Sequence, residues 1–584
     1  MTDRQVDRQT GGRTGYPSID KPQLQYYRQF PVRDINVNQT IYDLVFGSNQ
    51  DNLYLHAIKY LGKEWTYKEL KEKTDRASEA FYNAGIREGD VVLVGLSNCP
   101  EAIIILLAIN KIGGVSKWFD VRAGEKDIED YIVENNCKIA IVFDSVVSKI
   151  QSVDNNTNLE RVLVVTPVDS LSIPVRLAYH VKNKNKITAK PNCEYQRYYD
   201  FVKGLSGNGN SPKALFDKNR PSVMIQSSGT TGKPKVIVHS DFSATSAVSK
   251  LAYSDLPLEK GKILLDLLPP WIAYAIGEAV LYPLALGTEV ILCPTFDPDA
   301  IMDYLGTFQV VMAAPFHYRY LYEHFDNIPE GKKKQFLDNT ECLISGGDKI
   351  SIEENRGFEE KFKAPLVNGW GNNEGWGCLA VNSTKENCYG SVGIPKYGET
   401  LIAYDNESGE ELPYNKSGEI CALTDTMFLK YANNDGETRA VKKLHKDGQI
   451  WLHTGDLGFI DENGHVFLEG RIRRVIIRQG FKISAYTIED KLTEHPLVKE
   501  CVAVEVEDST EEHVPMAFVV LKNPVMDEKA FTKELREKCI KELKEYEVPK
   551  YIIIVSELPY TQNGKYDFRL LEQRGKEYVE SKKS

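Results

Sequence analysis

Residues 227–235 read Ser-Ser-Gly-Thr-Thr-Gly-Lys-Pro-Lys, and this stretch decides how the rest of the chain is interpreted. Hydroxyl side chains and glycines spaced this closely predict a loop whose backbone N–H groups can surround an anion, with lysine adding positive charge. The loop is not a Walker A loop, because two residues separate its glycines and Pro234, not Ser or Thr, follows Lys233. The continuation Val236-Ile237-Val238 is typical of a strand, so we expect the loop to join two strands.

Around this loop, from about Thr40 to Leu468, short apolar runs alternate with longer amphipathic stretches. Residues 91–96 predict a buried strand, and residues 100–108 predict a helix with proline in its first turn. Further strands are expected at 139–143, 162–165, 263–268, 290–293 and 310–313. This alternation predicts a large N-terminal α/β domain with mixed or parallel sheets.

After Gly470 the chain becomes densely charged. Apolar strands at 503–506, 517–521 and 551–555 are separated by amphipathic helices such as 527–545, which predicts a small α+β C-terminal domain joined by a hinge. The expected organisation is therefore an N-terminal extension over 1–35, disordered or draped, a large domain over 36–470 and a small mobile domain over 471–584.

The amino-acid composition limits the classes of protein to which the chain can belong. A chain of 584 residues with 42% hydrophobic and 27% charged residues predicts a soluble globular protein of at least two domains. Its net charge of -11 argues against a nucleic-acid partner, since phosphate binding needs clustered Lys and Arg. Ten cysteines without a CxxC pair or clustered His fit neither a disulfide framework nor a zinc site, and favour a reducing compartment, the cytoplasm. No secretory signal and no apolar run of membrane-spanning length is found.

Two segments interrupt the alternation of predicted strands and helices. Residues 203–218 are rich in Gly, Ser, Asn and Pro and predict a flexible loop. Residues 171–186 form a short amphipathic stretch that ends in three lysines. That stretch is either a surface helix that covers part of the core or a weak adhesion site for an anionic bilayer, so any membrane contact is expected to be peripheral.

The nine residues of the loop, in this order, resemble the phosphate loop of the adenylate-forming superfamily: acyl-CoA synthetases, luciferases and the adenylation domains of peptide synthetases. The resemblance extends from about Thr40 to Leu570, and the later motifs follow in the expected order. It implies that an ATP·Mg²⁺-dependent ligase first converts a carboxylic acid to its acyl-adenylate. It implies next that the acyl group passes to the thiol of coenzyme A.

The resemblance implies a set of ATP- and AMP-binding residues. Glu374 is implied to hold Mg²⁺ against the phosphates, the aromatic ring of Trp370 to stack on adenine, and Asp456 to accept hydrogen bonds from the ribose hydroxyls. The full implied set is Ser227, Ser228, Gly229, Thr230, Thr231, Gly232, Lys235, Gly346, Gly347, Asn368, Gly369, Trp370, Gly371, Asn373, Glu374, Asp456 and Arg471.

The C-terminal motifs imply two alternating roles for the small domain. Lys565, in Thr-Gln-Asn-Gly-Lys, matches the catalytic lysine, which stabilises negative charge as the carboxylate attacks the α-phosphate. Arg473 occupies the hinge position. Gly480, Phe481 and Lys482 match the loop that turns toward the site for thioester formation, where glycine would let the pantetheine chain pass close.

Four positions depart from the commoner family pattern. Trp370 replaces Tyr, Asn373 replaces Thr, Arg473 replaces Asp or Lys, and Ile477 replaces Lys. Trp still offers a flat face and Asn a hydrogen-bonding group, so activity is still expected, whereas the acid cannot be assigned by analogy.

The acyl pocket is expected around Trp271, Tyr274 and Phe316. The segment 268–274 has no Asp to pair with an α-ammonium group, so free amino acids are disfavoured. Its apolar residues favour a medium- or long-chain fatty acid first and an aromatic acid second.

Three alternatives stay open. The adenylate could be transferred to an acyl carrier protein acting in trans, or the chain could be an adenylate-binding homologue without catalytic activity. A P-loop phosphohydrolase is the third, and the loop spacing disfavours it.

Overall fold

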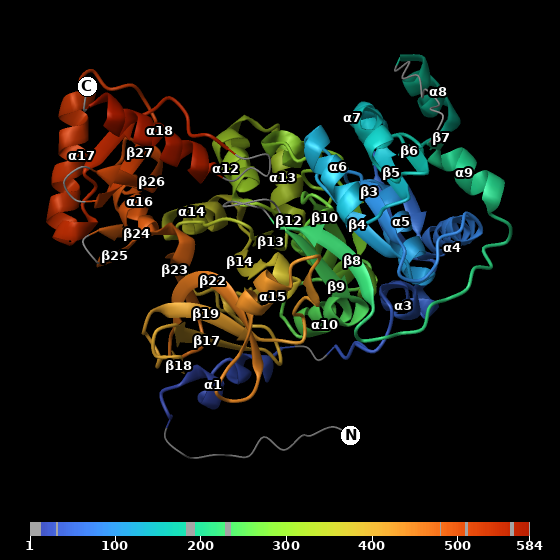
Figure 1. Cartoon of the computed structure of the whole chain (residues 1–584), viewed down its shortest axis with the longest axis horizontal. Coiled ribbons are helices and arrows are strands. Elements are labelled where there is room, and N and C mark those ends of the chain that lie inside the picture. The colour runs from blue at the N-terminus through green and yellow to red at the C-terminus, as the bar shows by residue number, and fades with distance from the viewer. Residues whose placement is uncertain are drawn as a thin grey trace.

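The structure, a computed structural model, describes residues 13–30, 33–182, 193–227, 235–478, 481–508, 512–560 and 566–582. Three large sheets with their helices form one body, and the C-terminal strands and helices form a smaller lobe beside it (Figure 1). The predicted α/β large domain with mixed and parallel sheets and the small α+β domain are confirmed. The predicted boundary at 470/471 falls at the end of β23 (Val466–Arg471).

The first sheet has the strand order β20-β9-β8-β4-β3-β5-β6-β7. The strands from β8 to β7 run parallel in the order written, and β9 pairs antiparallel with β8. The strands are β3 (Val91–Gly95), β4 (Val115–Trp118), β5 (Ile139–Phe143), β6 (Arg161–Val165), β7 (Glu194–Arg197), β8 (Pro221–Gln226), β9 (Val236–Ser240) and β20 (Lys430–Tyr431). Strands β8 and β9 flank residues 227–235, so the predicted loop joins two strands, as expected.

The second sheet has the order β16-β15-β14-β13-β12-β10-β11-β1-β2. Its centre is parallel and its two edges are antiparallel. The strands are β1 (His56–Tyr60), β2 (Lys63–Thr66), β10 (Ile263–Asp266), β11 (Glu289–Leu292), β12 (Val310–Ala313), β13 (Cys342–Ser345), β14 (Leu366–Asn372), β15 (Gly377–Val381) and β16 (Ile394–Pro395).

The third sheet is antiparallel, with the order β18-β17-β19-β22-β21 and β23 paired to β22. Its other strands are β17 (Thr400–Asp405), β18 (Glu410–Glu411), β19 (Gly418–Leu423), β21 (Lys442–Leu444) and β22 (Ile450–Ile460). The N-terminal helix α1 (Pro17–Asp20) lies against it, since Ser18 N donates to Glu411 of β18, and helix α2 (Leu24–Tyr27) reaches the edge of the second sheet, since the Tyr27 hydroxyl donates to the carbonyl of Pro395 in β16. The described part of the N-terminal extension is therefore draped over these two sheets.

The helices of the large body begin where the sequence supplies a cap. Thr66 caps α4 (Tyr67–Asn83) and Ser351 caps α14 (Ile352–Phe362), each in a capping box with a glutamate three residues later. The remaining helices of eight or more residues here are α5 (Pro100–Lys111), α6 (Glu125–Glu134), α8 (Ile173–Lys182), α9 (Tyr198–Leu205), α10 (Asp241–Leu251), α12 (Pro315–His324) and α13 (Glu330–Asn339). Shorter ones are α3 (Ile41–Gly47), α7 (Val147–Val153), α11 (Tyr282–Ala285) and α15 (Asp435–Val441).

The small lobe contains the hairpin β24 (Val475–Arg478) and β25 (Phe481–Ser484), and a three-stranded sheet of β26 (Val498–Asp508), β27 (Glu512–Leu521) and β28 (Tyr551–Ile554). Helices α16 (Ala485–Thr493), α17 (Glu528–Glu542) and α18 (Phe568–Ser581) pack on this sheet and enclose two apolar clusters of its own. A lobe with its own core can move as a unit.

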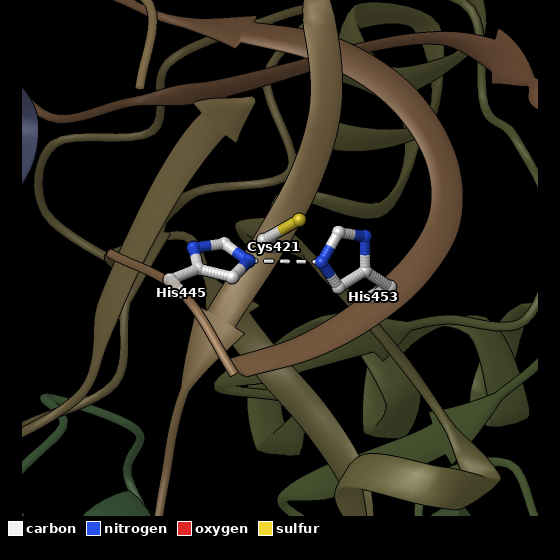
Figure 2. A group of neighbouring side chains, drawn as sticks. All are labelled: Cys421, His445 and His453. Atoms are coloured by element: carbon white, nitrogen blue, oxygen red, sulfur yellow. Dashed lines mark hydrogen bonds between the residues drawn. The ribbon is translucent and has the colours of Figure 1, made fainter. Parts of the chain in front are cut away.

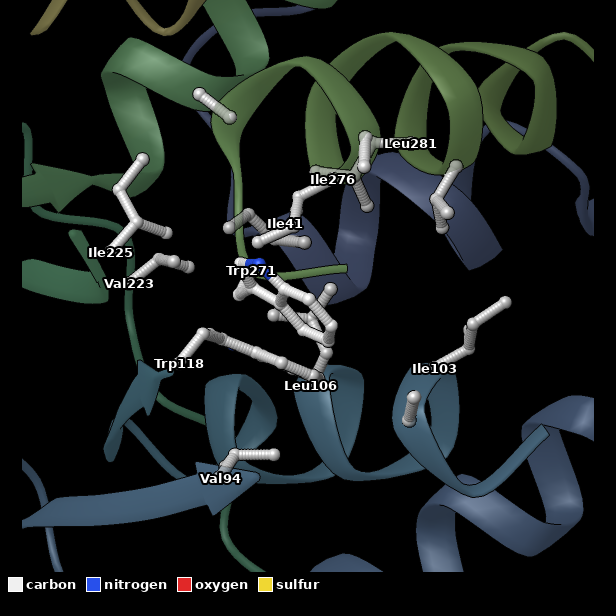
Figure 3. Close-up of a cluster of buried hydrophobic side chains, with 14 of the residues drawn as sticks. Ile41, Val94, Ile103, Leu106, Trp118, Val223, Ile225, Trp271, Ile276 and Leu281 are labelled. Carbon is white, nitrogen blue, oxygen red and sulfur yellow. The ribbon is translucent and has the colours of Figure 1, made fainter. Parts of the chain in front are cut away.

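The main core surrounds α5, every residue of which is buried, as expected for a helix that is apolar on all sides. Figure 3 shows Ile103 and Leu106 of this helix facing Trp118, Trp271 and Ile276. Trp271 is 4% exposed and meets Phe296 edge to face. The segment expected to line the acyl pocket is thus built into the core.

Two sequence interpretations need correction. The loop predicted to be flexible at 203–218 begins inside α9, and its remainder is irregular but held against α4: the carboxylate of Glu79 accepts from the N–H groups of Gly207 and Gly209. Helix α8 does not cover the core, because its apolar residues Ile173, Leu177 and Val181 are more than half exposed. No helix within the described ranges is both long and apolar enough to cross a membrane.

Candidate functional site

The predicted adenine and ribose residues meet at Asp456. Its Oδ2 accepts a hydrogen bond from the indole Nε1 of Trp370 at 2.9 Å, and its Oδ1 pairs with Nε of Arg471 at 2.9 Å. Register explains the second contact, since Asp456 of β22 lies opposite Arg471 of β23. Asp456 is only 4% exposed, but each carboxylate oxygen has a second lone pair, so both can still accept from a ligand hydroxyl.

The ends of the predicted phosphate loop are closed by Ser227 and Lys235. Ser227 N donates to the carbonyl of Lys235, and Lys235 N donates to Oγ of Ser227, both at 2.9 Å. The Nζ of Lys235 pairs with Glu437 of α15 at 2.6 Å and lies 5.0 Å from the ring centroid of Tyr431. The loop between them, with Ser228, Gly229, Thr230, Thr231 and Gly232, lies outside the described residues.

Glu374, which is expected to hold Mg²⁺, keeps one carboxylate oxygen uncommitted among the described residues. It lies in the short 3₁₀ turn η7 (Asn373–Gly375), half-buried, and its Oε1 accepts from the hydroxyl of Tyr431 at 2.7 Å. Within the described part of the chain, Oε2 has no hydrogen-bond partner, which leaves a carboxylate oxygen available to Mg²⁺. Because Tyr431 touches both Glu374 and Lys235, it joins the proposed metal ligand to the phosphate loop.

Both polar side-chain atoms of Asn373 hold its turn against two other segments of the chain. Its Oδ1 accepts from Ala273 N at 3.1 Å, and its Nδ2 donates to the carbonyl of Gln226 at 2.8 Å. His239 holds the same turn, since its Nε2 lies 2.7 Å from the carbonyl of Asn373 and therefore donates. Burial lowers the pKa of His239 to about 3, so the ring is neutral. These hydrogen bonds of Asn373 and His239 hold in place the 3₁₀ turn that contains Glu374.

The predicted glycines have separate reasons to be glycine. Gly347 has φ +90°, a left-handed conformation that favours glycine. A Cβ at Gly371 would lie 1.7 Å from the carbonyl oxygen of Gly377, so the β14–β15 hairpin requires glycine there. Asn368 ends the parallel pairing opposite Ser345, and its carbonyl accepts from Asn382 N.

The region expected to bind the acyl group lies between Gly346 and the chain around Tyr274. A Cβ at Gly346 would sit 3.1 Å from Cε1 of Tyr274, so the tyrosine ring covers this backbone. Among the described residues, the Tyr274 hydroxyl and the Trp271 indole N–H have no hydrogen-bond partner. Phe316 is half-buried next to His317, and burial lowers the pKa of His317 to about 4.

A π-helix, η4 (Ala275–Leu281), follows Tyr274 and carries a buried carboxyl group, Glu278. Such helices are rare and occur frequently at functional sites. Oε1 of Glu278 accepts from Cys378 N at 2.9 Å. Burial raises the pKa of Glu278 to about 8, so the group is protonated and uncharged at neutral pH.

The small lobe meets the large body beside this site. Nζ of Lys349, next to Asp348, pairs with Asp490 of α16 at 2.6 Å. Burial and the neighbouring Glu500, Tyr560 and Asp348 raise the pKa of Tyr566. Lys565 and Gly480 lie outside the described residues, as do the side chains of Arg473, Phe481 and Lys482. The backbone of Arg473 belongs to the 3₁₀ turn η8 (Ile472–Arg474), and Arg478 and Phe481 face each other in β24–β25.

Sequence reasoning missed Tyr431, His239 and Glu278. Tyr431 lies 57 residues after Glu374, and only the pairing of β20 with β9 brings it to the phosphate loop. His239 could have been noticed as a polar residue at the end of an apolar strand run. Nothing in the sequence marks Glu278 as buried.

Comparison with known proteins shows to which family the chain belongs. The profile of the family described as AMP-binding enzyme matches residues 49–432, and that of the AMP-binding enzyme C-terminal domain matches 487–565. A long-chain-fatty-acid–CoA ligase of Bacillus subtilis (strain 168) is 27% identical, over 88% of this chain and 91% of the relative. 4-Coumarate–CoA ligase 4 of Arabidopsis thaliana is 24% identical, over 78% and 77%.

Solved structures share the fold. An anthranilate CoA ligase in complex with anthranoyl-AMP superimposes with a TM-score of 0.78 at 20% identity, covering 95% of this chain and 99% of its own. The ATP-bound MatB of Rhodopseudomonas palustris gives a TM-score of 0.80 at 22% identity, covering 93% and 100%.

Proposed function

The chain belongs to the family of AMP-binding enzymes and is an acid–thiol ligase of the AMP-forming acyl-CoA synthetase type, and we propose that it activates a carboxylic acid with an apolar acyl group. In the first step a carboxylate oxygen attacks the α-phosphorus of ATP and pyrophosphate leaves, which gives the acyl-adenylate. In the second, the sulfur of coenzyme A attacks the acyl carbon and AMP leaves. The observation that carries the proposal is the contact of Asp456 with both Trp370 and Arg471.

Each part of the site has a proposed task. Trp370 and Asp456 hold the adenosine, and the loop closed by Ser227 and Lys235 holds the phosphates. Glu374 holds Mg²⁺, which when bound neutralises phosphate charge. Lys565 supplies a point cation where negative charge develops during the first step.

The small lobe serves the two steps in turn. We propose that it rotates about Arg473, which removes Lys565 from the site and brings in the segment of Gly480, Phe481 and Lys482 for the thiol. The Lys349–Asp490 pair supports such movement, because its side chains are about half exposed and exposed pairs contribute only about 0–1 kcal/mol. An enclosed site also keeps the reactive adenylate from water until the thiol arrives.

The acid is proposed from the walls of the acyl region. Two titratable groups there, His317 and Glu278, are uncharged at neutral pH, because burial lowers the pKa of His317 to about 4 and raises that of Glu278 to about 8. A cavity of about 20 Å³ between α5 and the 270–280 segment is too small for an acyl chain, but its lining of mainly apolar side chains, among them Ile103, Leu106, Trp118, Ile276 and Val280, shows the apolar character of this region. A fatty acid is therefore our first choice and an aromatic acid our second, and both types of ligase occur among the relatives.

We propose that the enzyme works in the cytoplasm and that coenzyme A, not a carrier protein, is its acceptor. All ten cysteines lie in the described part of the chain and are free thiols, which suits a reducing compartment. Contact with a membrane is proposed to be peripheral at most, through the exposed apolar residues of α8.

The experiment measures pyrophosphate release from ATP·Mg²⁺ with a panel of fatty, aryl and amino acids, with and without coenzyme A. Release that depends on one acid class, needs Lys565 and gives the acyl-CoA supports the proposal. If acyl-adenylate accumulates in the presence of coenzyme A, the acyl acceptor is a carrier protein and not coenzyme A. ATP binding without release for any acid indicates the homologue without catalytic activity.

A further inference from the structure

Three side chains of the third sheet point toward one another beside the strand that also carries Asp456. Cys421 comes from β19, His453 from β22, and His445 from the turn between β21 and β22 (Figure 2). The Nε2 atoms of the two histidines are 2.9 Å apart, and Sγ of Cys421 lies within 4.8 Å of both. Cys421 and His453 are buried and His445 is half-buried.

This donor set and spacing fit a zinc ion. Thiolate sulfur and imidazole nitrogen are the usual protein ligands of Zn²⁺, at about 2.3 and 2.0–2.1 Å in tetrahedral geometry. Two tetrahedral nitrogen ligands then lie roughly 3.3 Å apart. The observed 2.9 Å between the ring nitrogens is within a few tenths of an ångström of that value, so small side-chain rotations admit the ion.

The surrounding residues orient the histidines as a zinc site requires. Nδ1 of His453 lies 2.7 Å from Oε2 of Glu419, and Gly455 N donates to Oε1 of the same carboxylate. The carboxylate cannot donate, so Nδ1 of His453 carries the proton and its Nε2 presents a lone pair to the cluster. The ring of His445 stacks between Tyr404, at 4.2 Å between centroids, and Trp451, at 5.3 Å, which fixes its plane.

We propose that Cys421, His445 and His453 bind a Zn²⁺ ion, with a solvent molecule in the fourth position on the half-exposed side of His445. Without the ion, the short contact needs a proton on Nε2 of His445. When zinc binds, the Cys421 thiol releases its proton to solvent and the proton of His445 moves to Nδ1, so each ligand presents a lone pair.

The site braces the strand that carries the nucleotide residue, since Asp456 lies three residues after His453 in β22. The ion would tie β19, β22 and the turn after β21 together. A second group with metal-ligating side chains, His56, Glu64 and Glu289, lacks a thiol, and His56 is half exposed, so it serves as a comparison and not as a site.

The first test measures the metal content of the full-length protein by mass spectrometry after dialysis against zinc and then against metal-free buffer. We expect about one equivalent of zinc in the wild type and in His56→Gln, and none retained in Cys421→Ser or His445→Gln. Glu419→Gln, which alters a positioning residue, should weaken zinc affinity about 10–100-fold. Zinc that is absent from the wild type, or that the Cys421 and His445 variants retain, overturns the proposal.

X-ray absorption at the zinc edge of the wild type keeps the test independent of how the variants fold. One sulfur at about 2.3 Å and two imidazole nitrogens at about 2.0–2.1 Å support the site. A shell of oxygen and nitrogen without sulfur excludes Cys421 and overturns it.

Discussion

The indole nitrogen of Trp370 donates to Asp456 across 86 residues of chain, so the ring that would face adenine and the carboxylate that would bind ribose form one unit. Tyrosine carries its donor as a hydroxyl at the tip of the ring, whereas tryptophan carries an N–H on the indole edge, and here that N–H is the group that meets the carboxylate. Arg471 contacts the other oxygen of the same carboxylate.

Replacing Trp370 with Phe keeps an aromatic face and removes the donor. Hydrogen bonds to charged groups contribute about 1.5–3 kcal/mol, so KM for ATP should rise about tenfold or more while kcat changes little. Steady-state kinetics at saturating acid measure this. Trp65→Phe is the control, because Trp65 is buried in β2 and its N–H has no partner among the described residues. An unchanged KM in Trp370→Phe would show that the Asp456 contact is unimportant for ATP.

Glu374→Gln should lower the rate of adenylation about a hundredfold or more, because an amide oxygen is a weak substitute for a carboxylate on Mg²⁺. The loss should be partly recovered at high Mg²⁺ concentration. Tyr431→Phe removes only the hydroxyl on Oε1 and should shift the Mg²⁺ requirement modestly. Pyrophosphate release as a function of Mg²⁺ separates the two variants, and equal Mg²⁺ curves for wild type and Glu374→Gln would remove Glu374 from the metal site.

Lys565→Ala should lower acid-dependent pyrophosphate release by about 10²–10³, since a charge placed at the developing transition state is lost. Conversion of preformed acyl-adenylate and coenzyme A to the thioester should stay near the wild-type rate, because Lys565 serves the first step only. Lys576→Ala, at an exposed position of α18, is the matched control. A variant that loses both half-reactions equally would contradict the alternation of the small lobe.

Strands and helices could be predicted from the sequence because burial requires apolar residues at regular positions along them. The predicted strands at 91–96, 139–143 and 310–313 agree with β3, β5 and β12 to within a residue, since apolar runs between turns have few other solutions. The pairing of Asp456 with Arg471 could be predicted as well, because two antiparallel strands that follow each other in the chain bring such residues opposite each other.

Contacts between segments far apart in the chain could not be predicted from the sequence. Tyr431 reaches Glu374 because their strands are brought together by sheet pairing, and the two polar side-chain atoms of Asn373 form hydrogen bonds with Ala273 and Gln226. The cysteine pattern did not indicate the group of Cys421, His445 and His453, because Cys421 and His453 lie opposite each other on two paired strands and are far apart in the sequence. Side-chain contacts of this kind depend on the register between paired strands, and the composition and spacing of residues do not determine that register.

Glu278→Gln should flatten the dependence of stability on pH. Burial raises the pKa of Glu278 to about 8 in the folded chain, against 4.5 for an ordinary glutamate. A raised folded pKa contributes stability that is fully present below pH 4.5 and is lost as the pH rises toward 8. Each pKa unit corresponds to about 1.4 kcal/mol, so the free energy of unfolding of the wild type should fall by a few kcal/mol relative to the variant across this range. Denaturant titrations at several pH values measure it, with the exposed Glu353→Gln as control. Parallel pH profiles would show that Glu278 is ionised in the folded protein at neutral pH.

Gly346→Ala should narrow the passage for the acid. The added methyl group would lie 3.1 Å from the ring of Tyr274, so the ring must shift by a few tenths of an ångström into the space proposed for the acyl group. One methylene in an apolar pocket changes discrimination by about 10–200-fold, so kcat/KM for the preferred acid should fall at least tenfold. Gly331→Ala in α13, where the methyl group meets open space, should be neutral. Adding Tyr274→Val to Gly346→Ala should restore activity with the same acid; if the double variant stays as impaired as the single one, Tyr274 does not border the acyl group and the proposed pocket is wrong.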